Sequence, residues 1–304
     1  MKWNNIILIP LFCILIFSTA YSQESFLNKE EWYVNFDNYM ESNGLLVIDD
    51  KAYKAHWYLG ELEEYNSSII NLDEYGFYTA DFGAEHYYLF YSDYGFQHAV
   101  EIPKEQGNWV YEEIKKDQSW DLNILSISSS SFLSETIDGK KINYDVNNFL
   151  LRFFDGPTGS VFYNYPALPW VEGVEGNGIG EKIEITFNDD FQGISILGGF
   201  VDIVRPYLFR ANSRPRQIKI TSVSDESPFE MFVNFHDSVQ YTDVIFPKKT
   251  NHIVIEIIEV YDGEKWQDTC ISTIFPLWDD HQNNLETYKK YLQKIKNGEP
   301  AIAF

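Results

Sequence analysis

Three aromatic side chains lie among carboxylates, amides and a guanidinium in the second half of the sequence, and this mixture suits a saccharide. A sugar ring presents a flat patch of C–H bonds surrounded by hydroxyls, so an aromatic ring stacks on it while planar polar groups bond the hydroxyls. The candidate stacking residues are Trp170, Tyr261 and Trp266. The candidate hydroxyl partners are Glu172, Glu175, Asp262 and Asp268 as acceptors and Asn212 and Arg214 as donors. These residues form our hypothesis for a glycan-binding site.

Each candidate also has a structural interpretation. Trp170 is the right size to plug the end of a β-sandwich, and Arg214 can pair with Glu172 or Glu181 to hold two loops together. Tyr261 and Trp266 are equally compatible with a packing pair at a hairpin edge. Asp268 suits a turn cap, and the glycines of the first loop suit a tight connection with or without a ligand (Gly173, Gly176, Gly178 and Gly180).

Enzymatic motifs are missing from the sequence. Glycoside hydrolysis needs two carboxylates about 5–9.5 Å apart across a cleft, and nothing indicates a cleft around Glu172 and its neighbours Glu175 and Glu181. The sequence contains no Gly-x-Ser-x-Gly, His-Glu-x-x-His, P-loop or Cys-x-x-Cys motif. We therefore expect no enzyme and no catalytic residue. Carboxylates on such loops also suit calcium, so a structural Ca²⁺ remains an alternative and no other cofactor is expected.

The elements that must position these residues are strands. Alternating or continuous apolar runs predict strands at five places in the second half: Lys182–Phe187, Gln217–Val223, Phe229–Phe235, Val239–Phe246 and His252–Val260. No helical period separates them, so we expect a β-sandwich or jelly roll. From Leu285 to Ile295 the apolar spacing becomes helical, which predicts a short C-terminal helix.

The first half of the chain is acidic and rich in aromatic residues. Residues 23–122 hold 21 acidic and 6 basic side chains. A cap at Asn28, an apolar stripe and a stop at Gly44 predict a helix at its start. Strands are predicted after it, separated by breaks at 49–50, 65–68 and 93–95 (Leu45–Ile48, Lys51–Tyr58, Phe77–Phe82, His86–Ser92, Phe96–Ile102 and Trp109–Ile114). We expect a small antiparallel β domain whose role the sequence does not indicate.

The N-terminus has the features of a cleaved signal peptide. Lys2 precedes an apolar run from Ile6 to Phe17, and small residues at 20 and 22 predict cleavage before Gln23. The run is shorter than a membrane span, and bulky Phe12 argues against a lipid anchor on Cys13. We expect export to the periplasm, the cell surface or the medium. The predicted divisions are 1–22 signal peptide, 23–122 β domain, 123–278 sandwich and 279–304 helical tail.

The net charge limits the classes of binding partner, and the cysteine count excludes an internal disulfide. The formal net charge of −23 argues against nucleic acid or anionic lipid. Cleavage of the signal peptide leaves Cys270 as the single cysteine, so no internal disulfide is expected, and a lone cysteine in this context is typically a buried small hydrophobe.

Three ordered stretches resemble one known family. The segment from Trp170 to Glu181 (WVEGVEGNGIGE), the run Asn212-Ser213-Arg214-Pro215, and the segment from Val260 to Ser272 (VYDGEKWQDTCIS) are similar to the NADase-type glycan-binding domain. This is the F5/8 type C, discoidin-like module also attached to a bacterial NAD glycohydrolase toxin. The resemblance extends from about Ile124 to Trp278 and implies a discoidin-like (galactose-binding-like) jelly-roll sandwich with a glycan or glycoconjugate as partner.

Two residues depart from the family pattern. Thr273 stands where the family carries Glu, which removes a carboxylate, and Phe200 stands where a Tyr is common. The expected function is an exported, non-enzymatic glycan-binding protein. The alternative is a cell-envelope interaction or scaffold module in which the glycine-rich loop is structural.

Overall fold

The computed structural model describes residues 31–35, 41–48, 51–58, 61–83, 85–92, 95–102, 124–150, 152–154, 161–166, 168–203, 205–224 and 228–277. These residues are mostly in strands, which confirms the predicted mainly-β class. Within these ranges the helices are one 3₁₀ turn, Val146–Leu150, and one short α-helix, α1 (Leu208–Ala211). None of the described helices is long and apolar enough to cross a membrane.

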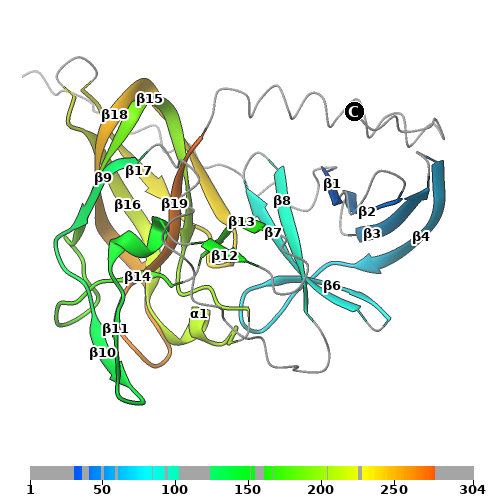
Figure 1. Ribbon diagram of the computed structural model, residues 1–304. Coiled ribbons are helices and arrows are strands. Elements are labelled where there is room, and N and C mark those ends of the chain that lie inside the picture. The colour runs from blue at the N-terminus through cyan, green and yellow to red at the C-terminus, as the bar shows by residue number, and fades with distance from the viewer. Residues whose placement is uncertain are drawn as a thin grey trace, which may run out of the picture.

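The second half forms the predicted sandwich from one seven-stranded antiparallel sheet (Figure 1). Its path runs β14-β19-β15-β18-β16-β17, and β9 pairs with β15 beside it. The strands are β9 (Ile124–Ser129), β14 (Trp170–Val171), β15 (Lys182–Gly198), β16 (Arg214–Ser222), β17 (Glu230–Asn234), β18 (Tyr241–Tyr261) and β19 (Cys270–Leu277). Two small hairpins flank them: β10 (Ser134–Ile137) with β11 (Lys140–Asn143), and β12 (Arg152–Phe154) with β13 (Val161–Pro166).

The long strands β15 and β18 each pass from one layer of the sandwich to the other, so that a single sheet forms both layers. The first part of β15 pairs with β9 and the second part with β19, while β18 runs beside both parts. The register of the β15–β18 pair shifts between Thr186 and Gly193, and such irregularities allow strands to pass from one layer to the other. The ribbons of β15 and β18 turn over together at the top of Figure 1.

The core lies between the layers and follows the predicted alternation. In β15, Ile183, Ile185 and Phe187 are buried while Lys182 and Glu184 face solvent. Isoleucines from β16, β18 and β19 complete the same cluster. Burial of each such side chain stabilises the fold by roughly 1.5–3 kcal/mol.

Two of the predicted strands are one element. Val239–Phe246 and His252–Val260 both lie in β18, which is 21 residues long. The exposed run of Pro247, Lys248 and Lys249 resembles a turn in the sequence, but here it belongs to the bend of a continuous strand. Likewise, Lys182–Phe187 is only the beginning of the 17-residue β15.

The first half forms two four-stranded antiparallel sheets. One contains β1 (Glu31–Asn35), β2 (Glu41–Ile48), β3 (Lys51–Tyr58) and β4 (Glu61–Ile69). The other contains β5 (Asn71–Leu72), β6 (Tyr78–Phe82), β7 (Glu85–Ser92) and β8 (Gly95–Ile102). Five predicted strands are confirmed within a few residues, whereas Trp109–Ile114 lies outside the described residues.

Two predictions in this half are wrong. The expected helix between Asn28 and Gly44 is replaced by β1 and β2, which pair from Glu31↔Val47 to Asn35↔Asn43. The aromatic and β-branched residues 32–34 suit a strand, and pairing with a neighbour outweighs a weak helical pattern. The predicted break at 65–68 lies inside β4, which is paired with β3 along its length.

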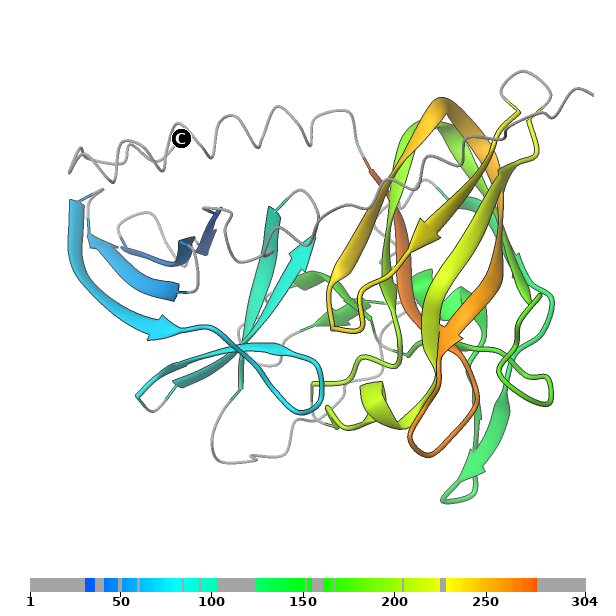
Figure 2. The same cartoon turned by 180° about the vertical axis from the view of Figure 1, so that it is seen from behind.

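The sheet of β5–β8 packs on the outer face of the sandwich. Phe77, Tyr88 and Phe90 share a buried cluster with five residues of the second half (Leu197, Val201, Phe209, Val239 and Tyr241). The cyan ribbons of this sheet lie beside the sandwich in both Figure 1 and Figure 2. The predicted signal peptide and the helical tail at 279–304 lie outside the described residues, and the four predicted divisions of the chain remain predictions.

Candidate functional site

The three family-like stretches meet at one end of the sandwich. Trp170 and Val171 pair with Ile271 and Cys270, so the first stretch lies against the third. Ser213 of the second stretch bridges to Thr269; its N–H donates to Asp268 O at 3.1 Å, and its carbonyl accepts from Cys270 N–H at 3.1 Å. We call this end the rim and define it as residues 172–181, 207–216, 235–238 and 261–269.

Glu172 closes the glycine-rich loop from inside. Its side chain is fully buried, Oε2 accepts from Val174 N–H at 2.8 Å, and Oε1 accepts from Thr269 N–H at 3.3 Å. Gly178 packs directly on it: a Cβ at that position would lie 2.4 Å from Glu172 Cγ, and φ there is +64°. Burial raises the pKa of Glu172, although the two amide donors oppose the rise. This carboxylate joins two rim loops and is not exposed to a ligand.

Glu181 has partners other than the predicted arginine. Its Oε2 accepts from Ser130 Oγ at 2.6 Å and also from Ser131 Oγ. On the opposite side of the same loop, Thr269 Oγ donates to Asn177 O at 2.7 Å. Glu175, between these anchors, is exposed, so it is the one acidic candidate of the loop that a ligand can reach.

Trp170 is a plug of the sandwich. Its side chain has no exposed surface, and its indole Nε1–H donates to Ser131 O at 2.9 Å. It packs in the central cluster with the isoleucines of the strands. The geometry therefore favours the structural interpretation of Trp170 over sugar stacking.

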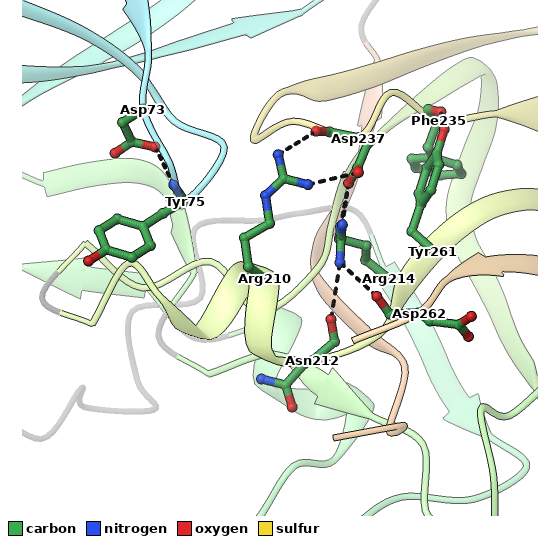
Figure 3. A network of polar contacts seen from close by, with 9 residues as sticks. All are labelled: Asp73, Tyr75, Arg210, Asn212, Arg214, Phe235, Asp237, Tyr261 and Asp262. Atoms are coloured by element: carbon green, nitrogen blue, oxygen red, sulfur yellow. Dashed lines mark hydrogen bonds and ion pairs between the residues drawn. The ribbon is translucent and has the colours of Figure 1, made fainter. Parts of the chain in front are cut away.

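Arg214 pairs with a residue that the sequence did not single out. Its Nε and Nη2 both lie 2.5 Å from Asp237 Oδ1, and Arg210 Nη1 lies 2.7 Å from Asp237 Oδ2 (Figure 3). Neither Glu172 nor Glu181 is its partner, so that predicted pairing is wrong. Asp237 stands in the run His236-Asp237-Ser238, which resembles only a turn, and nothing local in the sequence marks it as the acceptor of two arginines.

Aromatic rings lie close to the guanidinium groups of these arginines. The guanidinium carbon of Arg214 lies 5.1 Å from the ring centre of Phe209 and 5.6 Å from that of Tyr261. Arg210 also lies over Phe209, at 5.6 Å, and Arg216 over Tyr261, at 5.8 Å. Burial lowers the pKa of Arg214, and the nearby Asp237 carboxylate opposes that shift. Arg214 is thus a buried cation held by one carboxylate and two rings.

Tyr261 and Asn212 are likewise engaged internally. The Tyr261 hydroxyl donates to Phe235 O at 3.0 Å, and two guanidinium groups lie over its ring. The buried Asn212 caps the end of α1, because its Nδ2 donates to Leu208 O at 2.9 Å. Neither side chain presents a free flat surface to a sugar in this structure.

Trp266 keeps an accessible surface. Its ring packs against the buried cluster of Tyr144, Val171, Phe200, Leu208 and Cys270 but is only partly buried, and Lys265 Nζ lies 4.1 Å from its ring centre. The backbone of this loop rests on the α1 segment, since Lys265 and Trp266 N–H both donate to Ala211 O. Asp262, Glu264 and Asp268 lie within four residues of Trp266 in the same loop and are exposed or partly exposed.

The accessible part of the rim therefore holds the rings of Tyr207 and Trp266, the cations of Lys265 and Arg216, and several carboxylates. Of the predicted residues, Glu175, Asp262, Trp266 and Asp268 present polar or aromatic surface, and Tyr261 is partly buried. The other four are buried (Trp170, Glu172, Asn212 and Arg214). Among the described residues, no group of three His, Cys, Asp or Glu side chains is arranged to hold a metal ion. Cys270 is fully buried and burial raises its pKa, as expected for a structural thiol.

Comparison with known proteins finds similarity to the second half of the chain. Residues 163–276 match the family described as NAD glycohydrolase translocation F5/8 type C domain, and no curated protein matches the chain. Similar solved structures include an arabinofuranosyltransferase, AftD, from Mycobacteria (12% identity, 49% of this chain, 10% of that chain, TM-score 0.33). Two carbohydrate-binding modules are also similar. One is the CBM32 of AlyQ in complex with 4,5-unsaturated mannuronic acid (11% identity, 51% of this chain, 95% of that chain, TM-score 0.30).

The other is CBM32-3 from a family 31 glycoside hydrolase of Clostridium perfringens (11% identity, 55% of this chain, 98% of that chain, TM-score 0.35). This chain spans only a tenth of the arabinofuranosyltransferase but nearly the whole of each module. The family match includes all three rim stretches, and its two-layered β fold is the one the stretches predicted. Residues 163–276 are therefore similar to the NAD glycohydrolase translocation F5/8 type C domain.

Proposed function

We propose that this protein is exported, is not an enzyme, and binds a glycan at the rim of its F5/8 type C domain. One observation carries the proposal: backbone hydrogen bonds join three family-like stretches, far apart in the sequence, into a single rim. One loop of this rim holds the partly exposed Trp266 and exposed or partly exposed carboxylates. A structural role alone does not require an aromatic ring and hydrogen-bonding groups on the solvent side of that rim.

The binding mode follows from the accessible groups. Trp266 stacks on the C–H face of a sugar once the exposed Lys265 moves aside, a low-cost motion for a flexible chain in water. Asp268 and Asp262 accept from the sugar hydroxyls. The net charge of −23 repels polyanions at long range, so a neutral saccharide is the favoured ligand class.

The test is a glycan array followed by calorimetry on the secreted form, residues 23–304. We expect Trp266→Ala to abolish binding while the melting temperature changes little. Phe232→Ala is the matched control, because Phe232 is a 55% exposed aromatic on β17, outside the rim. Failure of the wild type to bind any glycan, or equal binding by the two variants, would refute the proposal.

The alternative is a cell-envelope interaction or scaffold module. It is favoured by the internal engagement of Trp170, Glu172, Asn212 and Arg214, four of the nine candidates. On this alternative, the rim loops hold their shape without a sugar and Trp266 contacts a protein. A wild-type protein that binds no glycan but is recruited to the cell envelope, with recruitment lost in Trp266→Ala and kept in Phe232→Ala, would favour this alternative.

Export and absence of catalysis have their own tests. N-terminal sequencing of the protein from culture medium and envelope fractions should begin at Gln23. Chromogenic glycosides should not be hydrolysed. Turnover by wild type that is lost in Glu175→Gln, the exposed carboxylate of the glycine-rich loop, would show that the protein is a hydrolase.

A further inference from the structure

The ring of Phe209 lies between the two halves of the protein. A Cβ on Gly199, in the sandwich, would lie 2.5 Å from Phe209 Cε2, and a Cβ on Gly76, in the first half, would lie 2.9 Å from Phe209 Cε1. Phe77 also packs edge-on to Phe209, with ring centres 6.5 Å apart. The absence of a side chain on each glycine is therefore what lets the two halves close on this ring.

The turn Asp73–Phe77 that carries Gly76 is built for rigidity. Asp73 Oδ1 accepts from Tyr75 N–H at 2.9 Å and from Phe77 N–H at 2.8 Å, and the Asp73 N–H donates to Phe77 O at 2.8 Å. Such side-chain bonds to the local backbone fix a turn in one conformation. A backbone hydrogen bond joins this turn to the second half of the chain: Val239 N–H donates to Gly76 O at 2.7 Å.

The docked turn reaches the charged part of the rim. Phe209 carries the guanidinium groups of Arg210 and Arg214 over its ring, and both arginines hold Asp237, two residues before Val239. A Cβ on Gly76 would also lie 3.2 Å from Arg210 Nη2. Figure 3 shows the turn residues Asp73 and Tyr75 in the same view as this network.

We propose that the turn Asp73–Phe77 is a positioning element of the rim. It fixes the position of the Phe209 ring. Through that ring it fixes the positions of the Arg210–Asp237–Arg214 network and of α1, on which the Trp266 loop rests. The first half is then a required part of the binding end and not an independent module. The step to ligand affinity rests on the proposed glycan function, whereas the mechanical coupling does not.

The experiment measures hydrogen exchange in the full secreted chain. Gly76→Ala is compared with Gly83→Ala, which lies in the same sheet, also has a positive φ (+69° against +97°), and places its Cβ within 4 Å of nothing. We expect Gly76→Ala to accelerate exchange of the amides of residues 208–213 by about tenfold, which corresponds to a loss of about 1.4 kcal/mol in local opening. The paired part of the β16–β17 hairpin, 217–221 with 230–234, lies beyond Arg214 and should exchange at the wild-type rate in both variants.

A second variant guards against a local effect of the methyl group. Asp73→Ala removes the bonds that shape the turn without adding an atom near Phe209, and it should accelerate the same amides. If Gly76→Ala and Asp73→Ala leave residues 208–213 at the rate of Gly83→Ala, or accelerate the β16–β17 hairpin equally, the coupling is refuted. If a glycan ligand is found, its affinity should fall in the first two variants and not in Gly83→Ala. If none is found, the exchange result alone decides the coupling.

Discussion

Replacement of Gly178 by alanine should destabilise the rim far more than replacement of the other loop glycines. At Gly178 the new Cβ would lie 2.4 Å from Glu172 Cγ and 2.6 Å from Cδ, against an ordinary carbon contact of about 3.5–4.0 Å. The buried carboxylate must move by about 1 Å, and its hydrogen bonds to Val174 and Thr269 N–H are then lost.

The expected cost has two parts. Alanine at a left-handed φ costs about 1–2 kcal/mol, and a buried ion that loses its donors adds about 2–3 kcal/mol. We therefore expect a fall of about 3–5 kcal/mol in the free energy of unfolding for Gly178→Ala. Gly176→Ala and Gly180→Ala are matched controls: both have positive φ, +105° and +94°, and a Cβ there meets nothing within 4 Å. They should cost only the backbone part.

The assay is urea denaturation followed by circular dichroism. The double variant Gly178→Ala/Glu172→Ala provides a second check, because truncation of Glu172 removes the collision partner and the two costs should not add. A Gly178→Ala protein no less stable than Gly180→Ala, or strictly additive costs in the double variant, would refute the account of Glu172 as the loop lock.

Three further predictions concern the same end of the sandwich. Trp170→Ala should lower the unfolding free energy by about 3–5 kcal/mol, measured by the same denaturation, because it empties a fully buried site; a cost under about 1 kcal/mol would contradict its role as a plug. Asp237→Asn leaves the buried Arg214 without its carboxylate and should lower the unfolding free energy by about 2–4 kcal/mol, less than the loss of a fully buried pair because Asp237 is 38% exposed. The control is Glu259→Ala, which removes an exposed ion pair and should lower the unfolding free energy by less than about 1 kcal/mol. Burial raises the folded-state pKa of Glu172, so the folded state binds more protons than the unfolded state above pH 4.5. The difference in unfolding free energy between wild type and Glu172→Gln should therefore fall as pH rises through that region and then level off. A rising or flat difference would show that burial does not raise the pKa of this carboxylate.

The strands that the sequence predicted in the second half show alternation between a buried and a more exposed face, whereas β19 is buried along almost its whole length and was not predicted. Ile183, Ile185 and Phe187 alternate with Lys182 and Glu184, and a period of two has no other compact solution. The prediction of a helix between Asn28 and Gly44 was wrong because it used only local sequence preferences. A capping pattern reports only local preference, and pairing of residues 31–35 with residues 43–47 is a long-range contact that no window of the sequence contains.

The site was predictable in its grouping but not in its exposure. The resemblance placed the stretches around Trp170, Asn212 and Asp268 together, and the bridge of Ser213 to Thr269 confirms it. Residue types could not say which side chains face solvent, since a tryptophan suits a plug and a platform equally. The partner of Arg214 was out of reach, because Asp237 lies in a loop whose approach depends on how β17 and β18 bend.

The division at residue 122 shows the same limit at the scale of domains. Composition changes there, from a strongly acidic, aromatic-rich half to a more balanced one, but composition records what a segment contains and not what it covers. Tyr241 packs against Phe90 at 6.4 Å between ring centres and against Phe275 at 5.6 Å, so one ring belongs to the cores of both halves. A sandwich cut at that boundary exposes Leu197, Val201 and Tyr241 together, and exposed apolar patches of this kind promote association. In residues 123–278 alone, sugar binding would therefore be measured on a protein that exposes an apolar surface which the intact chain buries. The intact secreted chain is the form in which to measure binding at the rim.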